Sequence, residues 1–207
     1  MPVKSFRCDR PKRRASFHFV KSMSAKRKHL TEDEMNRLLK AAKEGRHGKR
    51  DYCLLLICYK RGFRVSELIE LEISDIDLGS GQIQVRRKKG SLSTQQRLTG
   101  DELRAYRDWL RDRMAWQGSG QPYVFLSERG QCFTRQAVNH IVKEAGERAA
   151  IGFRVHPHML RHSCGFALAN NGHDTRLIQD ALGHKNIAHT VRYTATAAER
   201  FNDLWKR

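Results

Sequence analysis

Apolar residues recur at helical spacing along most of the chain, and the first clear helix start lies near residue 31. In the segment Thr31-Glu32-Asp33-Glu34, the side chains of Thr31 and Glu34 can each bond the other residue's backbone amide. This capping pattern predicts a helix that begins after Thr31 and ends near Gly45. The apolar positions expected on its buried face are Met35, Leu38, Leu39 and Ala42. The same periodicity predicts helices over about 51–60, 65–71, 101–116, 134–149, 158–170 and 174–182, with a short last helix from about 196.

Between Asp75 and Leu98 the pattern changes to an alternation of apolar and polar residues, which is typical of strands. The apolar positions are Ile76, Leu78, Ile83 and Val85, and Gly79 and Gly81 separate the two pairs. This pattern predicts a hairpin, and a second turn at Lys89-Gly90-Ser91 leads to a third strand near 95–98. The predicted fold class is therefore mostly α with a small antiparallel β-sheet (α+β), in one compact domain.

The chain is strongly basic, with 40 Lys and Arg against 22 Asp and Glu and a formal net charge of +18. A small domain needs only about 2–8 net charges to stay soluble, so this excess indicates a polyanionic partner, of which nucleic acid is the commonest. The alternative is a basic surface that only contacts water. Residues 1–28 hold ten Lys or Arg and one acidic residue, Asp9. We interpret them as a basic, flexible arm before a domain over 29–207, and phosphate contact and a solvated tail are both open for the arm.

The five cysteines are scattered along the chain and odd in number, which favours free thiols inside the cell over a disulfide framework. The longest apolar run extends from Cys53 to Tyr59, well short of the ~20 residues that span a membrane. The N-terminus lacks the apolar core of a signal peptide. We therefore expect a cytoplasmic protein at the bacterial nucleoid, with no membrane partner.

One set of polar residues stands out because its chemistry fits a single reaction. The set comprises Arg64, Lys89, His158, Arg161, His184 and Tyr193. Each member alone has a structural explanation, such as a surface arginine, a helix-end histidine or a half-buried tyrosine. Together they suit the attack of a phenol on a phosphodiester. Guanidinium groups bind the non-bridging oxygens, a histidine removes the phenolic proton, and a lysine protonates the departing 5′ oxygen. This chemistry needs no metal ion and no cofactor, and we expect none.

The motifs around these residues resemble the signature motifs of the tyrosine recombinases. They are Arg61-Gly62-Phe63-Arg64-Val65-Ser66-Glu67-Leu68, His158-Met159-Leu160-Arg161-His162, and Leu182-Gly183-His184 followed by Tyr193. They occur in the family's order, with its His-x-x-Arg spacing and its nine residues from histidine to tyrosine. The resemblance covers roughly residues 30–200.

The resemblance implies a role for each matching residue. Tyr193 would be the nucleophile, Arg64 and Arg161 would clamp the scissile phosphate, and His158 would be a general base or acid. His184 would donate a hydrogen bond to the phosphate, and Glu67 would support the site from behind. Lys89 matches the lysine that protonates the leaving group, with Lys88 as an adjacent alternative. The residues expected to contact DNA are Arg7, Arg10, Lys12, Arg13, Arg14, Lys26, Arg27, Lys28 and Lys88.

Many members of this family carry a separate helical DNA-clamping domain before the catalytic one, whereas a basic segment of about 28 residues precedes it here. This short plan resembles the fimbrial phase-variation invertases of enteric bacteria. The resemblance implies inversion of a segment between inverted repeats, with double-stranded DNA as substrate and a tetramer at synapsis. Accessory DNA-bending proteins are further expected partners. It also implies that a C-terminal helix over about 196–207 contacts the next subunit through Phe201, Leu204 and Trp205, and that the tyrosine segment can stay withdrawn until DNA and partner subunits bind.

Three alternatives remain open from the sequence. The chain could be a non-cleaving DNA-binding regulator derived from a recombinase, or a type IB-like topoisomerase that shares the chemistry. A metal site is the third, because His156, His158, His162 and Cys164 lie within nine residues. Their spacing, however, fits no usual zinc pattern.

Overall fold

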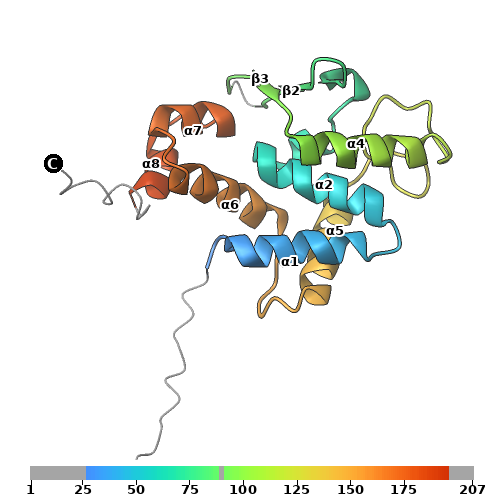
Figure 1. Ribbon diagram of the computed structural model, residues 1–207, viewed down its shortest axis with the longest axis horizontal. Helices are drawn as coiled ribbons and strands as arrows, with labels where there is room; N and C mark the ends of the chain where they lie inside the picture. The colour runs from blue at the N-terminus through green and yellow to red at the C-terminus, as the bar shows by residue number, and fades with distance from the viewer. Residues whose placement is uncertain (1–26, 89–90, 196–207) are drawn as a thin grey trace, which may run out of the picture.

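The computed structural model describes residues 27–88 and 91–195. The arm over 1–26, the Lys89-Gly90 pair and the expected C-terminal helix over 196–207 lie outside the described residues. Helices surround one central helix, and a small sheet lies at one end of this group of helices (Figure 1). The helices are α1 (Glu32–Lys43), α2 (Gly48–Arg61), α3 (Val65–Leu68), α4 (Gly100–Arg113), α5 (Arg135–Arg148), α6 (Pro157–Asn170), α7 (Thr175–Leu182) and α8 (Ala188–Thr194).

The central helix is α2, which lies between α1, α4 and α6 (Figure 1). All residues from Cys53 to Cys58 are at most 1% exposed, so this stretch of the helix is apolar on every side and forms the middle of the core. Gly62 ends α2 in the left-handed conformation, with φ of +56°. The chain turns sharply there, which brings Phe63 into the core and leaves Arg64 at the start of α3.

The sheet has three antiparallel strands in the order β1 (Ile76–Asp77), β2 (Gln82–Val85) and β3 (Thr94–Arg97). A short 3₁₀ helix over Ile73–Asp75 precedes it. Ile83 pairs with both Ile76 and Gln96, and its side chain is fully buried. Ile76, Ile83 and Val85 thus face the core, and the alternation continues past the end of β2 to the buried Arg87.

The C-terminal helices form a second, smaller core. Cys164, Ala169, Ile178, Leu182 and Tyr193 pack together where α6, α7 and α8 meet (Figure 1). The helix α8 was not predicted, because Val191 is the one strongly apolar side chain in Ala188–Thr194. The helix is stabilised by packing more than by its own sequence.

The prediction of a mostly α fold with a small antiparallel sheet is confirmed, with corrections at element ends. The helix expected over about 101–116 ends at Arg113, and Trp116 folds back to pack edge-on against Trp109. The helix expected over about 65–71 ends at Leu68, because Leu71 bonds Val124 in an extended segment. The four described cysteines carry free thiols. Within the described residues, no helix has the length and apolarity that crossing a membrane requires.

Candidate active site

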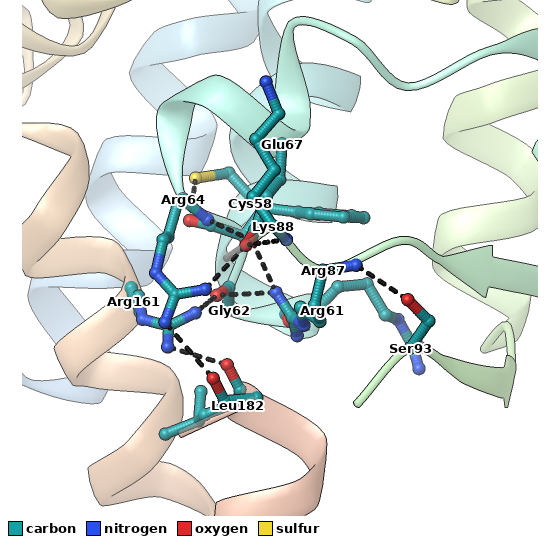
Figure 2. Close-up of polar contacts among 12 residues, drawn as sticks. Cys58, Arg61, Gly62, Arg64, Glu67, Arg87, Lys88, Ser93, Arg161 and Leu182 are labelled. Carbon is teal, nitrogen blue, oxygen red and sulfur yellow. Dashed lines mark hydrogen bonds and ion pairs between the residues drawn. The ribbon is translucent and has the colours of Figure 1, made fainter. Parts of the chain in front are cut away.

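Two arginines from distant parts of the sequence meet at the turn that follows α2. Arg161 of α6 is 2% exposed and donates to the carbonyl oxygens of Gly62 and Leu182, the second at 2.7 Å (Figure 2). Arg64 donates to the Gly183 carbonyl at 3.2 Å, while its side chain remains 31% exposed. The ends of α2 and α7 therefore hold both guanidinium groups, and Arg64 is the one that solvent reaches.

The close approach of α7 to this turn depends on glycine. A Cβ atom on Gly62 would lie 2.4 Å from Leu182 Cδ2, and the positive φ already disfavours any other residue there. Gly183 ends α7 in the same left-handed conformation, with φ of +64°. These two glycines let the carbonyl oxygens that bind the arginines face one another.

The charges of this cluster change the ionisation of its members. Burial, followed by the neighbouring charges of Arg64 and Arg87, lowers the pKa of Arg161 to about 10, so it stays protonated at neutral pH. Burial opposes ionisation of Glu67, yet the Arg64 backbone amide and the Arg87 charge bring its pKa below the ordinary value. The site therefore combines a buried carboxylate with several cations.

Glu67 lies behind the arginines with a side chain that is 0% exposed. Its Oε1 accepts from the Arg64 guanidinium at 2.6 Å and from the Lys88 backbone amide at 3.3 Å. Its Oε2 accepts from the Arg64 backbone amide at 3.0 Å and from Arg87 at 2.9 Å (Figure 2). This carboxylate thus orients Arg64 and the start of the turn after β2.

His184 follows the end of α7 and is neutral at physiological pH, because burial and then the charges of Arg161 and Arg64 lower its pKa to about 3. Its Nδ1 lies 2.9 Å from Thr190 Oγ1. When the Thr190 hydroxyl donates to Nδ1, the proton of the neutral ring is on Nε2. A neutral His184 held in this way can donate one hydrogen bond from Nε2.

His158 lies one turn before Arg161 on α6 and is the more exposed of the two. Burial, followed by the charge of Arg161, lowers its pKa. Its ring packs edge-on against His162, with the centroids 4.5 Å apart. His158 is thus a largely neutral imidazole at the surface, which suits proton transfer.

Tyr193 of α8 is buried away from solvent, at 1% exposure. Its hydroxyl lies 2.8 Å from His162 Nδ1, and no hydrogen bond among the described residues joins it to Arg64 or Arg161. Its ring lies over Gly165, where a Cβ atom would be 2.7 Å from Tyr193 Cε2. Burial raises the pKa of this phenol. In this arrangement the hydroxyl belongs to a pocket on α6 and not to the arginine cluster.

The structure thus brings together Arg64, Glu67, Arg161 and His184, with His158 one helical turn away, and it places the Tyr193 hydroxyl on His162. Lys89 lies outside the described residues, as do Arg7, Arg10, Lys12, Arg13, Arg14 and Lys26. Lys88 pairs with Glu70, Arg27 pairs with Glu34, and Lys28 is exposed. No group of three His, Cys, Asp or Glu side chains in the described residues could hold a metal ion.

Sequence reasoning missed four residues of the site: Arg87, His162, Gly165 and Thr190. Only Arg87 left a usable signal, because it continues the inward alternation of Ile83 and Val85. An arginine at such a position must be paired inside the fold. The other three depend on how α8 packs on α6.

Proteins of one known family are similar to this chain over most of its length. The model of the phage integrase family matches residues 28–200. The type 1 fimbriae regulatory protein FimB of Escherichia coli (strain K12) is 49% identical over 187 residues, which cover 90% of this chain and 94% of FimB. The regulatory protein FimE of the same strain is 47% identical over 184 residues, which cover 88% and 93% of the two chains.

Solved structures give the same result for the fold. A crystal structure of the XerA recombinase superposes with a TM-score of 0.76 and 32% identity, over 86% of this chain and 65% of that chain. The XerH site-specific recombinase, in a pre-cleavage complex with its difH substrate, superposes with a TM-score of 0.70 and 23% identity. That match covers 87% of this chain and 53% of the XerH chain, so this chain spans about half to two thirds of these recombinases.

Proposed function

The chain belongs to the phage integrase family, the site-specific tyrosine recombinases, and we propose that it breaks and rejoins DNA through a 3′-phosphotyrosyl bond at Tyr193. The observation that carries this proposal is the convergence of Arg64 and Arg161 on one turn, next to a neutral His184. Guanidinium groups fit the non-bridging oxygens of a phosphate and keep their charge at neutral pH.

In the proposed reaction, the Tyr193 oxygen attacks phosphorus and the bond from phosphorus to the 5′ oxygen breaks. His158 takes the phenolic proton, and Lys89 gives a proton to the departing 5′ hydroxyl. Arg64 and Arg161 bind the non-bridging oxygens, and His184 donates its Nε2 proton to one of them. Attack by a 5′ hydroxyl on the phosphotyrosine then rejoins the strand, so the reaction consumes no nucleotide.

The buried position of Tyr193 indicates that cleavage requires a movement of α8. The hydroxyl must leave His162 and reach the arginine cluster, and its raised pKa must fall beside those cations. We propose that binding of DNA and of further subunits favours the moved position, with a tetramer as the assembly that exchanges strands.

The substrate we propose is a DNA segment between inverted repeats whose inversion switches fimbrial genes on and off. The near full-length similarity to two fimbriae regulatory proteins supports this choice. We also propose that the basic arm, which holds ten Lys or Arg within residues 1–28, contacts DNA phosphates. The same proposal places the protein in the cytoplasm, at the nucleoid.

Replacement of Tyr193 by phenylalanine tests the chemistry. The protein is incubated with genomic DNA fragments that carry nicks. Where a nick lies close to the cleavage site, the short strand with the released 5′ hydroxyl dissociates. The DNA then cannot be rejoined, and the covalent complex is trapped. Wild type should form an adduct that resists denaturant, and sequencing of the captured ends should recover paired inverted repeats. Tyr193→Phe should bind the same fragments without an adduct.

Two outcomes would overturn the proposal. A wild-type protein that binds repeats without forming an adduct would be a non-cleaving regulator. Relaxation of supercoiled plasmid without such repeats, by the monomer, would identify a topoisomerase.

A further inference from the structure

Arg87, which follows β2, is a charged residue in the site with no exposed side-chain surface. Its side chain is 0% exposed, and it donates to Glu67 Oε2 at 2.9 Å and to the Arg61 carbonyl at 2.7 Å (Figure 2). It also donates to the carbonyl oxygens of Gly62 and Ala181. Arg87 therefore cannot contact a DNA phosphate in this arrangement, although it lies next to both arginines that we assign to the phosphate.

The partner shared by Arg87 and Arg64 is the carboxylate of Glu67. Each guanidinium bonds one oxygen of that carboxylate, Arg64 at Oε1 and Arg87 at Oε2. Lys88 contributes only its backbone amide, because its side chain pairs with Glu70. Two guanidinium groups thus bond one carboxylate, and their burial decides which of them Glu67 neutralises. Arg87 has no access to solvent, whereas the Arg64 side chain is 31% exposed.

A buried ion pair that loses one partner is strongly destabilised, so the fully enclosed Arg87 and Glu67 must neutralise each other. Arg64 then keeps a full positive charge for the substrate. Counting Arg64, Arg87 and Arg161 against Glu67 gives a net charge of +2. A phosphodiester under attack by a phenolate carries two negative charges, one from each group. The cluster therefore matches the charge of the transition state.

On the basis of the proposed function, we propose that Arg87 is a positioning residue that compensates the charge of Glu67 and so frees Arg64 to stabilise the scissile phosphate. Without Arg87, Glu67 would pair with Arg64 alone and reduce the net charge of the cluster to +1. The carbonyl bonds of Arg87 contribute by fixing its place beside Gly183, where a Cβ atom would lie 2.8 Å from Arg87 Cγ.

The test measures two quantities for each variant: affinity for the captured DNA site, and the rate of covalent adduct formation at saturating protein. For Arg87→Met we expect an affinity within about threefold of wild type, because Arg87 does not reach the DNA. The rate should fall roughly ten- to a hundredfold, as is usual when a group that orients a ligand from behind is removed. The matched control is Arg86→Met. Arg86 precedes Arg87 in the sequence, but its side chain is 62% exposed and pairs with Asp75 outside the site. Its adduct rate should stay within about threefold of wild type.

A double variant separates charge compensation from packing. Arg87→Met combined with Glu67→Gln removes one positive and one negative charge and restores the net charge of +2. We expect this double variant to form adduct at least fivefold faster than Arg87→Met alone. Arg87→Lys keeps the charge but loses the forked carbonyl bonds, and its rate should stay within about fivefold of wild type.

The melting temperature of each variant is measured first. If Arg87→Met is unfolded at the assay temperature, Arg87→Lys against wild type decides the question. An Arg87→Lys rate at least tenfold below wild type, or a double variant no faster than Arg87→Met, would overturn the inference and make Arg87 a packing residue. These rates can be compared only when the wild-type protein forms the adduct. Failure of wild type to do so overturns the proposed function instead.

Discussion

At the scale of single residues, the histidines around the site are held neutral by their surroundings. Burial, followed by the neighbouring His158 and the charge of Arg192, lowers the pKa of His162 from 6.5 to about 4. Its Nδ1 meanwhile bonds the Tyr193 hydroxyl. A neutral imidazole is thus part of the packing between α6 and α8, and protonation of that ring is unfavourable in the folded protein.

The lowered pKa of His162 in the folded protein predicts that the protein becomes less stable in mild acid. Between pH 6.5 and about 4 the unfolded chain takes up a proton on His162 that the folded protein does not, so the free energy of unfolding falls as the pH falls through this window. Above pH 6.5 the effect is absent. In urea denaturation at pH 7.0 and 5.0, His162→Asn should show a smaller loss of stability than wild type. An equal loss in both proteins would contradict the assignment to His162.

At the scale of elements, the turn that ends α2 links the fold to the site. Gly62 closes the helix, contacts Leu182 at the end of α7, and offers its carbonyl to both Arg87 and Arg161. One residue therefore sets the distance between two helices and the position of two guanidinium groups.

Gly62→Ala should destabilise the protein and abolish adduct formation. The left-handed backbone alone costs roughly 1–2 kcal/mol for a residue with a side chain. The new Cβ atom would also force Leu182 away from the turn. Urea denaturation gives the stability, and Gly152→Ala is the matched control, because no atom lies within 4 Å of a Cβ there. A Gly62→Ala variant as stable as the control would show that the turn adapts easily.

The elements also show how far sequence reasoning reaches. The start of α1 follows from local chemistry, the capping box at Thr31, and it was predicted, as was the end of α2 near residue 60. The helix α8 and the pocket for Tyr193 depend on packing against Gly165 and His162, which are 28 and 31 residues away in the sequence. Likewise, the motifs identified Arg64 and Arg161, but the contact between Arg87 and Glu67 is visible only once β2 is placed beside the turn.

At the scale of the whole molecule, the net charge of +18 should dominate the binding of DNA. Each phosphate contact contributes about −0.9 to the slope of log K against log salt concentration. If the arm contacts phosphates, the double change Arg13→Ala and Arg14→Ala should make that slope shallower by about 2, as measured by fluorescence anisotropy from 50 to 300 mM salt. An unchanged slope would mean that the two arm residues do not contact the DNA backbone.

The position of Tyr193 over Gly165 has a consequence for the safety of the chromosome. Under the proposed function, a single molecule that scans DNA keeps its nucleophile inside its own fold, so chance encounters would leave the strands intact. Breakage would then be confined to complexes with enough subunits to reseal every break. A side chain at position 165 would displace the phenol ring, and the expected result is unwanted nicks in the chromosome.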